Sequence, residues 1–193
     1  MSSNFDEIAQ MLVPCPSNGI NQDGRTNAAV AMILRQGRNG LEVLFIERAS
    51  HDRDPWSGDL AFPGGKVEEG EEPRQTAERE TMEEIGLDLG NCAHYLGWLT
   101  EITGSRLPVR VSCFVYGMLE MDLTTVVSGE VHDLFWVGLD ELLATDRHIL
   151  AQVRFGGKVQ DVPAIRLPQP GKPVLWGITY RLVKHFLELL PTV

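Results

Sequence analysis

The sequence predicts an α/β fold, in which helices cover both faces of a mixed β-sheet. Apolar runs of strand length outnumber the segments with helical periodicity. The helical segments fall at the start, in the middle and at the end of the chain, so they can cover a sheet built by the strands between them. The 193 residues are 43% hydrophobic and 23% charged, which suits a single domain, 1–193, with residues 1–25 as an N-terminal helix and polar lead-in.

The first third of the chain predicts a helix, a hairpin and a short strand. Residues 5–12 carry apolar side chains at helical spacing. Apolar runs at 28–34 and 41–47 flank the turn-forming sequence QGRNG, which is typical of a β-hairpin. A further short strand is expected at 59–62.

A turn and a central helix follow. The sequence Pro-Gly-Gly at 63–65 predicts the turn. Pro73 suits the first turn of a helix, where its missing N–H costs nothing, and Gly86 is suited to end that helix. The residues expected on the buried side of the helix are Thr76, Ala77, Met82 and Ile85.

The second half of the chain supplies the remaining elements. Strands are expected at 95–102, 109–119, 134–137 and 162–167, a short helix at 140–144, and a final helix at 177–190. The final helix repeats apolar residues at helical spacing, and we assign that stripe to the core.

Acidic residues are concentrated in one short segment. Between Glu68 and Glu84 there are eight glutamates and two arginines, a net charge of −6 out of −10 for the whole chain. Within this segment Glu80, Glu83 and Glu84 stand at i, i+3 and i+4, so they share one helix face and repel one another. Oxygen ligands in such a cluster suit a hard ion such as Mg²⁺ or Mn²⁺. On charge alone, a solvated acidic helix without an ion stays an equal alternative.

The rest of the composition excludes several classes. A net charge of −10 argues against nucleic-acid binding, which requires a basic face, although a bound divalent ion would still admit an anionic small substrate. No apolar run is long enough to span a membrane, and the N-terminus has no signal-peptide pattern. Cys15, Cys92 and Cys113 are widely spaced and odd in number, which predicts reduced thiols in a cytoplasmic protein.

The segment 65–87 resembles the Nudix box, Gx5Ex7REUxEExGU, where U is a bulky aliphatic residue. Gly65, Glu71 and the run from Arg79 to Leu87 match its glycine and charged positions at the required spacing. The one departure is Thr81, which stands where an aliphatic residue is expected. We expect Thr81 to face the core, so the departure from an aliphatic residue should weaken the packing there.

The resemblance implies a fold and a chemistry. Nudix domains are α/β/α sandwiches with a mixed central sheet and a loop-helix-loop catalytic motif. They cut a pyrophosphate bond in a nucleoside diphosphate linked to another group, and they use divalent metal. By resemblance Glu80, Glu83, Glu84 and the backbone carbonyl of Gly64 would hold the metal. Glu71 and Arg79 would brace the loop against the helix. The other glutamates of the segment, Glu68, Glu69, Glu72 and Glu78, are then expected to be solvated surface.

A second pattern, before the box, resembles that of coenzyme A diphosphatases. It comprises Arg48, Ala49, Arg53, Gly58 and the FPGG sequence that ends at Gly65, with one residue more than the pattern between Arg53 and Gly58. The C-terminal WGIT sequence also looks like that subgroup. Substrate phosphates need cations, and the candidates close to the box are Arg48, Arg53 and Lys66. Trp56, in the longer loop, is a candidate for stacking on a base.

Other residues are candidates for proton transfer or for binding a 3′-phosphate. Nudix enzymes often place a catalytic Glu on a loop after the box, and Glu130 stands in that region. Without it, Glu80 would have to take the proton. His51 and His132 are further titratable candidates, and Arg25, Arg106 and Arg110 could bind the 3′-phosphate of coenzyme A.

The preferred hypothesis is a Mg²⁺- or Mn²⁺-dependent hydrolase of coenzyme A or acyl-coenzyme A, with a small-molecule nucleotide as its only expected ligand besides metal. The first alternative is hydrolysis of nucleotide sugars, dinucleoside polyphosphates or damaged nucleoside triphosphates. The second is a nucleotide-sensing module without activity, which the intact set of box carboxylates disfavours. The resemblance also allows a homodimer through the N-terminal helix or the edge strands.

Overall fold

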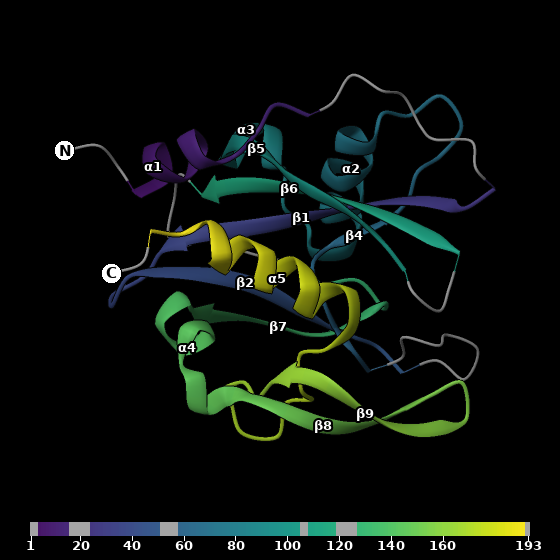
Figure 1. The fold of residues 1–193 in the computed structure, drawn as a ribbon. Helices are drawn as coiled ribbons and strands as arrows, with labels where there is room; N and C mark the ends of the chain where they lie inside the picture. Colours follow the sequence, from purple (N-terminus) through teal and green to yellow (C-terminus); the bar gives the residue numbers. More distant parts are fainter. Residues whose placement is uncertain (1–3, 16–23, 51–57, 105–107, 119–126, 192–193) are drawn as a thin grey trace.

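The computed structural model describes residues 4–15, 24–50, 58–104, 108–118 and 127–191 (Figure 1). Seven strands form the main sheet, in the order β3-β2-β1-β6-β5, with β4 paired to β1 and β7 paired to β2. Only β1 and β6 run parallel among these pairs, so the sheet is mixed, as predicted. The strands are β1 Thr26–Gln36, β2 Leu41–Arg48, β3 Leu60–Ala61, β4 Gly64–Lys66, β5 Ala93–Thr103, β6 Val109–Met118 and β7 Val131–Gly138.

Helices cover both faces of this sheet. One core lies between the sheet and the helices α1 and α5, and it includes Ile8, Leu182 and Phe186. The second core lies on the other face, where Ala77 and Ile85 of α2 pack on the strands. The helices are α1 Asn4–Met11, α2 Pro73–Ile85, α3 Leu89–Cys92, α4 Leu139–Leu143 and α5 Gly177–Leu189, with a 3₁₀ turn at Thr145–Arg147. The α/β/α sandwich is therefore confirmed.

A separate two-stranded sheet, β8 His148–Phe155 and β9 Lys158–Ile165, follows α4. It lies beside the sandwich and contacts α5 (Figure 1). Strand β8 was not predicted from the sequence, and β9 was predicted only from residue 162. Residues of β8 alternate between exposed and half-buried, so the strand has no fully buried face that would give an apolar signal.

Two local expectations were wrong, and one short helix was missed. Gly64 and Gly65 do not form a turn but lie in β4, because the chain there pairs with Ala29 and Val30 of β1. Helix α3 was not predicted. Met82 is 53% exposed and does not line the core.

The position expected of Met82 is taken by Thr81. Its side chain is fully buried, and its hydroxyl donates to the carbonyl oxygen of Ala77 at 2.7 Å. That bond satisfies the polar group that replaces the usual aliphatic side chain. The expectation that Thr81 faces the core is confirmed.

Candidate active site

An arginine and a glutamate join the loop before α2 to the helix itself. The Nε and Nη2 groups of Arg79 donate to the two carboxylate oxygens of Glu71, at 2.9 and 3.1 Å. Glu71 also accepts from the hydroxyl of Thr76 at 2.6 Å and from the backbone N–H of Glu68 at 3.2 Å. The hydrogen bonds from Arg79 are the main cause of the lowered pKa of Glu71, which is about 2. This geometry fits the bracing role that the sequence predicts for the pair.

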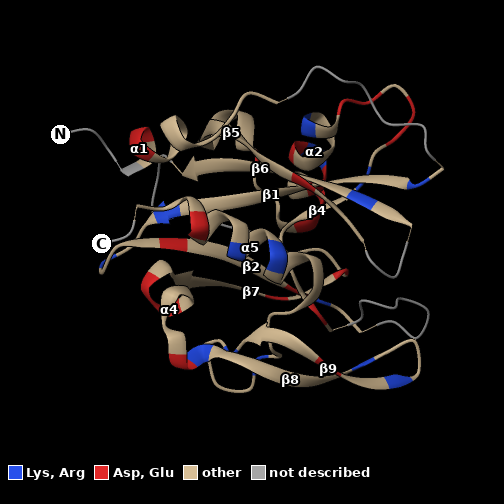
Figure 2. Ribbon diagram, viewed as in Figure 1, with Lys and Arg blue, Asp and Glu red and all other residues tan. Residues whose placement is uncertain are grey.

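The three carboxylates of α2 differ in their surroundings. Glu84 is buried, with 4% of its side chain exposed, whereas Glu83 is 59% exposed. Glu84 accepts a hydrogen bond from the backbone N–H of Gly64 at 2.9 Å, and the guanidinium of Arg48 lies 3.9 Å away. Arg79 donates to Glu80 at 2.9 Å and to Glu83 at 3.3 Å. Figure 2 shows acidic residues gathered on α2 and the loop before it.

Negative charge at this site exceeds the positive charge that compensates it. Burial raises the pKa of Glu84 to about 7, and the charges of Glu80 and Glu130 add to the rise. The N–H of Gly64 and the charge of Arg48 oppose it. Burial also raises the pKa of Glu80, with contributions from Glu83 and Glu130. A site in which carboxylates destabilise one another's charged forms is suited to a cation.

The chemistry of these donors fits a hard divalent ion, since all are carboxylate oxygens on adjacent turns of one helix. Among the described residues, however, no three His, Cys, Asp or Glu side chains stand close enough to hold an ion as they are placed. As placed, Arg79 donates hydrogen bonds to both Glu80 and Glu83. Glu83 is exposed enough to change its rotamer. The ligand roles of Glu80, Glu83, Glu84 and the Gly64 carbonyl therefore stay predictions.

Two glycines let the backbone approach these carboxylates. A Cβ on Gly65 would lie 2.3 Å from Oε1 of Glu80. Gly64 has a φ of 155°, and a Cβ there would lie 2.2 Å from the carbonyl oxygen of Ala29. A side chain at Gly64 would clash with the backbone of β1, whereas one at Gly65 would displace the carboxylate of Glu80.

Glu130 lies beside the box although it is far from it in sequence. Its backbone carbonyl accepts from the N–H of Ala49 at 2.8 Å, and the N–H of Ser128 donates to the carbonyl of Glu84 at 2.8 Å. The next residue, Val131, pairs with Arg48 at an irregularity where β7 has one residue more than β2. These bonds hold the loop 127–130 against the ends of α2 and β2. The charge of Glu130 contributes to the raised pKa of both Glu80 and Glu84, so this carboxylate lies near them.

Some of the candidate cations line the cavity and others do not. Arg48 and Lys66 both line the cavity described below. Arg110 does not line it, although its neighbours Val109 and Val111 do, because alternate residues of a strand face opposite sides. It binds Glu101 at 2.6 Å instead. Arg25 is exposed at the start of β1 and is not among the residues that line the cavity.

The remaining residues singled out from the sequence have other surroundings or lie outside the described residues. His132 lies on β7 with an exposed side chain. Arg53, His51, Trp56 and Arg106 lie outside the described residues. Glu78 is not simply solvated surface, as had been expected, because it accepts hydrogen bonds from Tyr116 at 3.0 Å and from Arg74 at 2.9 Å.

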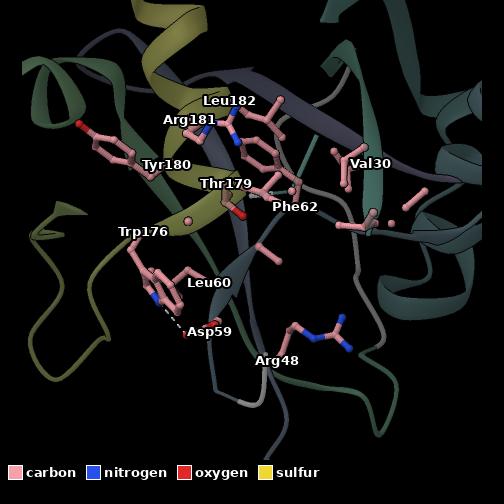
Figure 3. A pocket seen from close by; sticks show the side chains of 18 of the residues that line it. Val30, Arg48, Asp59, Leu60, Phe62, Trp176, Thr179, Tyr180, Arg181 and Leu182 are labelled. Atoms are coloured by element: carbon pink, nitrogen blue, oxygen red, sulfur yellow. Dashed lines mark hydrogen bonds between the residues drawn. The ribbon is translucent and has the colours of Figure 1, made fainter. Parts of the chain in front are cut away.

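A cavity of about 510 Å³ opens next to the box, on the face of the sheet that α5 covers. Arg48, Gly64, Gly65 and Lys66 line its box end. In Figure 3 Arg48 lies at one end and Leu182 at the other. Strands β1, β3, β6 and β9 and the start of α5 supply most of the remaining wall.

One wall of the cavity is an indole held in place by its neighbours. The Nε1 of Trp176 donates to Asp59 at 2.8 Å (Figure 3). The ring of Phe155 meets the indole edge-on with centroids 5.8 Å apart. None of these three residues was predicted from the sequence to belong to a site. The only signal was the WGIT sequence, which resembles the coenzyme A diphosphatase subgroup.

The comparisons with known proteins show the family of this chain. The family model of the NUDIX domain matches residues 25–155. The chain is 34% identical over 155 residues to the peroxisomal coenzyme A diphosphatase ndx-8 of Caenorhabditis elegans, covering 76% of this chain and 62% of that protein. It is 29% identical to the human mitochondrial coenzyme A diphosphatase NUDT8, covering 85% of this chain and 69% of that protein.

A solved structure also shares the fold. The NUDIX domain of Shewanella oneidensis NrtR, complexed with ADP ribose, superposes with a TM-score of 0.57 at 17% identity, covering 88% of this chain and 92% of that one. The chain belongs to the Nudix family and carries a Nudix hydrolase domain, whose members generally use divalent metals.

The chain is shorter than several of its relatives. It spans 36%, 59% and 62% of the length of three of the curated proteins that it matches. Within the described residues no helix combines the length and the hydropathy that crossing a bilayer requires.

Proposed function

We propose that this protein is a divalent-metal-dependent hydrolase that cuts the pyrophosphate bond of coenzyme A or acyl-coenzyme A. The products are 3′,5′-ADP and 4′-phosphopantetheine or its acyl ester. The observation that carries the proposal is that Arg48, whose guanidinium lies 3.9 Å from the buried Glu84, also lines a cavity of about 510 Å³. Carboxylates for metal, a cation for phosphate and room for a ligand thus lie together.

Mg²⁺ or Mn²⁺ is the ion that we propose for the site, held by Glu80, Glu83, Glu84 and the carbonyl of Gly64. When bound, such an ion supplies positive charge that screens the pyrophosphate and makes water more acidic. The raised pKa of Glu84 supports its role as a ligand, because a cation restores the charged form that burial disfavours.

The protein's own residues bind the phosphates and move the proton. Arg48 and Lys66 line the mouth and can hold the phosphoryl oxygens. The oxygen of a water molecule forms a bond to one phosphorus while the bond from that phosphorus to the bridging oxygen breaks. The water's proton passes to Glu130, which the loop 127–130 holds beside the box, and the bridging oxygen leaves on the other phosphate. If Glu130 does not take the proton, Glu80 is the remaining candidate.

The choice of coenzyme A rests on the relatives and on the pattern before the box. Two of the matched relatives are coenzyme A diphosphatases by name, and the chain covers more than two thirds of one of them. The names of these relatives place them in peroxisomes and mitochondria. A cytoplasmic location, like a homodimer, therefore stays a prediction for this chain.

A panel of pyrophosphate compounds tests the proposal. The protein is incubated with coenzyme A, dephospho-coenzyme A, nucleotide sugars, dinucleoside polyphosphates and nucleoside triphosphates, with Mg²⁺ or Mn²⁺, and the products are identified by mass spectrometry. We expect the highest kcat/KM for coenzyme A or its acyl esters. A preference for dephospho-coenzyme A or a nucleotide sugar would refute the substrate assignment while leaving the reaction class intact.

A further inference from the structure

Asp59 stands opposite Arg48 on the neighbouring segment of chain. The backbone N–H of Arg48 donates to the carbonyl oxygen of Asp59 at 3.0 Å, which continues the antiparallel pairing of Glu47 with Leu60 by one residue. Residues opposite each other in such a pair have their side chains on the same face, within reach of each other. Both residues line the cavity, and Figure 3 shows Asp59 beside Arg48. An aspartate and an arginine in this relation are able to form an ion pair.

The two side chains are turned to different partners. The carboxylate of Asp59 accepts from the Nε1 of Trp176 at 2.8 Å, on the side of α5 (Figure 3). The guanidinium of Arg48 lies 3.9 Å from the carboxylate of Glu84, on the side of α2. Arg48 is therefore directed at the carboxylates of the box, and Asp59 is directed at the indole.

The indole is fixed by contacts that do not depend on Asp59. The ring of Phe155 packs edge-on against Trp176, with centroids 5.8 Å apart. The preceding residue, Leu175, is fully buried and exchanges two backbone hydrogen bonds with Ile165 of β9, both of 2.9 Å. The N–H of Trp176 is thus a donor that the fold holds in one place.

The hydrogen bond from the indole affects how readily Asp59 binds a second donor. A carboxylate that loses a hydrogen-bond donor in a partly buried site gains free energy by finding another. The cation opposite it is Arg48, and a carboxylate bound to a guanidinium forms the strong, charge-assisted kind of hydrogen bond. Arg48 in such a pair would have fewer N–H groups left for a phosphoryl group.

We infer that Trp176 is a positioning residue, whose N–H holds the carboxylate of Asp59 toward α5 and so leaves Arg48 to Glu84 and the substrate phosphate. This inference rests on the proposed function, in which Arg48 binds a phosphoryl oxygen. Without the N–H, part of the protein would have Arg48 paired with Asp59. Only the remaining fraction would bind substrate, so the apparent affinity falls by that fraction while the reaction in the bound complex is unchanged.

The first test replaces the indole by a ring without a donor. Trp176→Phe keeps an aromatic ring against Phe155 and removes the N–H. We expect the KM for coenzyme A to rise about tenfold, with kcat within about twofold of wild type. Trp98→Phe is the matched control, because Trp98 is a half-buried indole on β5 that does not line the cavity, and both constants should be unchanged in it. An unchanged KM, or a loss confined to kcat, in folded Trp176→Phe would overturn the inference.

The second test separates competition for Arg48 from simple packing. Asp59→Asn keeps an oxygen that accepts from the indole and removes the charge that attracts Arg48. Alone it should leave the KM close to that of wild type, and added to Trp176→Phe it should return the KM to within about threefold of wild type. A KM that stays raised in the double variant would mean that the indole acts only by packing. A KM raised by Asp59→Asn alone would mean that Asp59 supports Arg48. Either result contradicts the inference.

A binding measurement keeps the two proposals apart. Isothermal titration with methylenediphosphonate, whose P–C–P link is not hydrolysed, measures the Kd in the presence of Mg²⁺ without any turnover. We expect weaker binding by Trp176→Phe than by wild type and recovery in the double variant. Equal Kd values in the three folded proteins, or no binding by wild type, would refute the inference even if coenzyme A is hydrolysed. Absence of hydrolysis across the panel would instead refute the proposed function, whatever the Kd values.

Discussion

The backbone N–H of Gly64 donates to the buried carboxylate of Glu84 at 2.9 Å, across twenty residues of sequence. The bond ties β4 to the last turn of α2. Position 64 requires a glycine, since a φ of 155° and the carbonyl of Ala29 leave no room for a side chain. The loop that enters the box and the helix that carries its carboxylates are thus one rigid unit.

Glu83→Gln should lower turnover by orders of magnitude while leaving the fold intact. Glu83 is largely exposed, so its loss removes a metal oxygen and little packing. Steady-state kinetics with Mg²⁺ or Mn²⁺ and thermal melting measure the two effects. Glu188→Gln is the matched control, because Glu188 is an exposed glutamate at the far end of α5. Near-normal activity of folded Glu83→Gln would mean that the metal site is misplaced.

Glu130→Gln should reduce kcat by about 10²- to 10⁴-fold with little change in KM, as expected for loss of a general base. The amide can keep the same backbone bonds, because Ala49 binds the carbonyl of residue 130 and not its side chain. A pre-steady-state assay separates the chemical step from product release. If kcat stays within about threefold of wild type, Glu130 is not the base, and Glu80→Gln becomes the next variant to measure.

Glu71→Gln should destabilise the protein at neutral pH by about 1.5–3 kcal/mol, because a charged hydrogen-bonded pair is lost. The pKa of Glu71 is about 2 in the folded protein against 4.5 ordinarily, so its ionised form favours folding. That stability is present above pH 4.5 and is lost as the pH falls toward 2. The difference in unfolding free energy between wild type and variant should shrink over this window. A difference that stays constant with pH would show that the ionised pair does not stabilise the fold.

Lys172→Met should destabilise the sheet by about 1.5–3 kcal/mol. Lys172 binds Glu47 at 2.7 Å and also binds Asp133, and these two carboxylates are cross-strand neighbours on β2 and β7. Without the lysine they face each other as like charges. Denaturant unfolding measures the loss of stability. The second substitution Asp133→Asn should recover part of the lost stability. Lys184→Met, at an exposed pair on α5, should stay within about 0.5 kcal/mol of wild type.

The sequence predicted those elements that are marked by residues close to one another in the chain. The hairpin of β1 and β2 and the helix α2 were predicted because apolar runs, Pro73 and Gly86 mark them within a few residues. Strand β8 was missed because its residues alternate between half-buried and exposed, and Leu150 in it is exposed. The resemblance indicated Glu130 from its place after the box. How it reaches the box is explained by the backbone bonds of Ala49 and Ser128 and by the pairing of Val131 with Arg48.

The cavity could not have been predicted in the same way. Its wall combines Asp59, Phe155 and Trp176 from three separate segments, and no periodicity joins them. The contact of Arg79 with both Glu80 and Glu83 was equally unexpected, because the sequence paired that arginine with Glu71 alone.

The central claim is that the carboxylates of α2 support metal-dependent cleavage of a pyrophosphate bond. The most direct measurement is mass spectrometry of the products from coenzyme A, with Mg²⁺ or Mn²⁺ present and then removed by a chelator. We predict 3′,5′-ADP and 4′-phosphopantetheine with metal and neither product without it. Absence of hydrolysis of coenzyme A and of every other pyrophosphate compound in the panel, or hydrolysis that persists after the metal is removed, would contradict the claim.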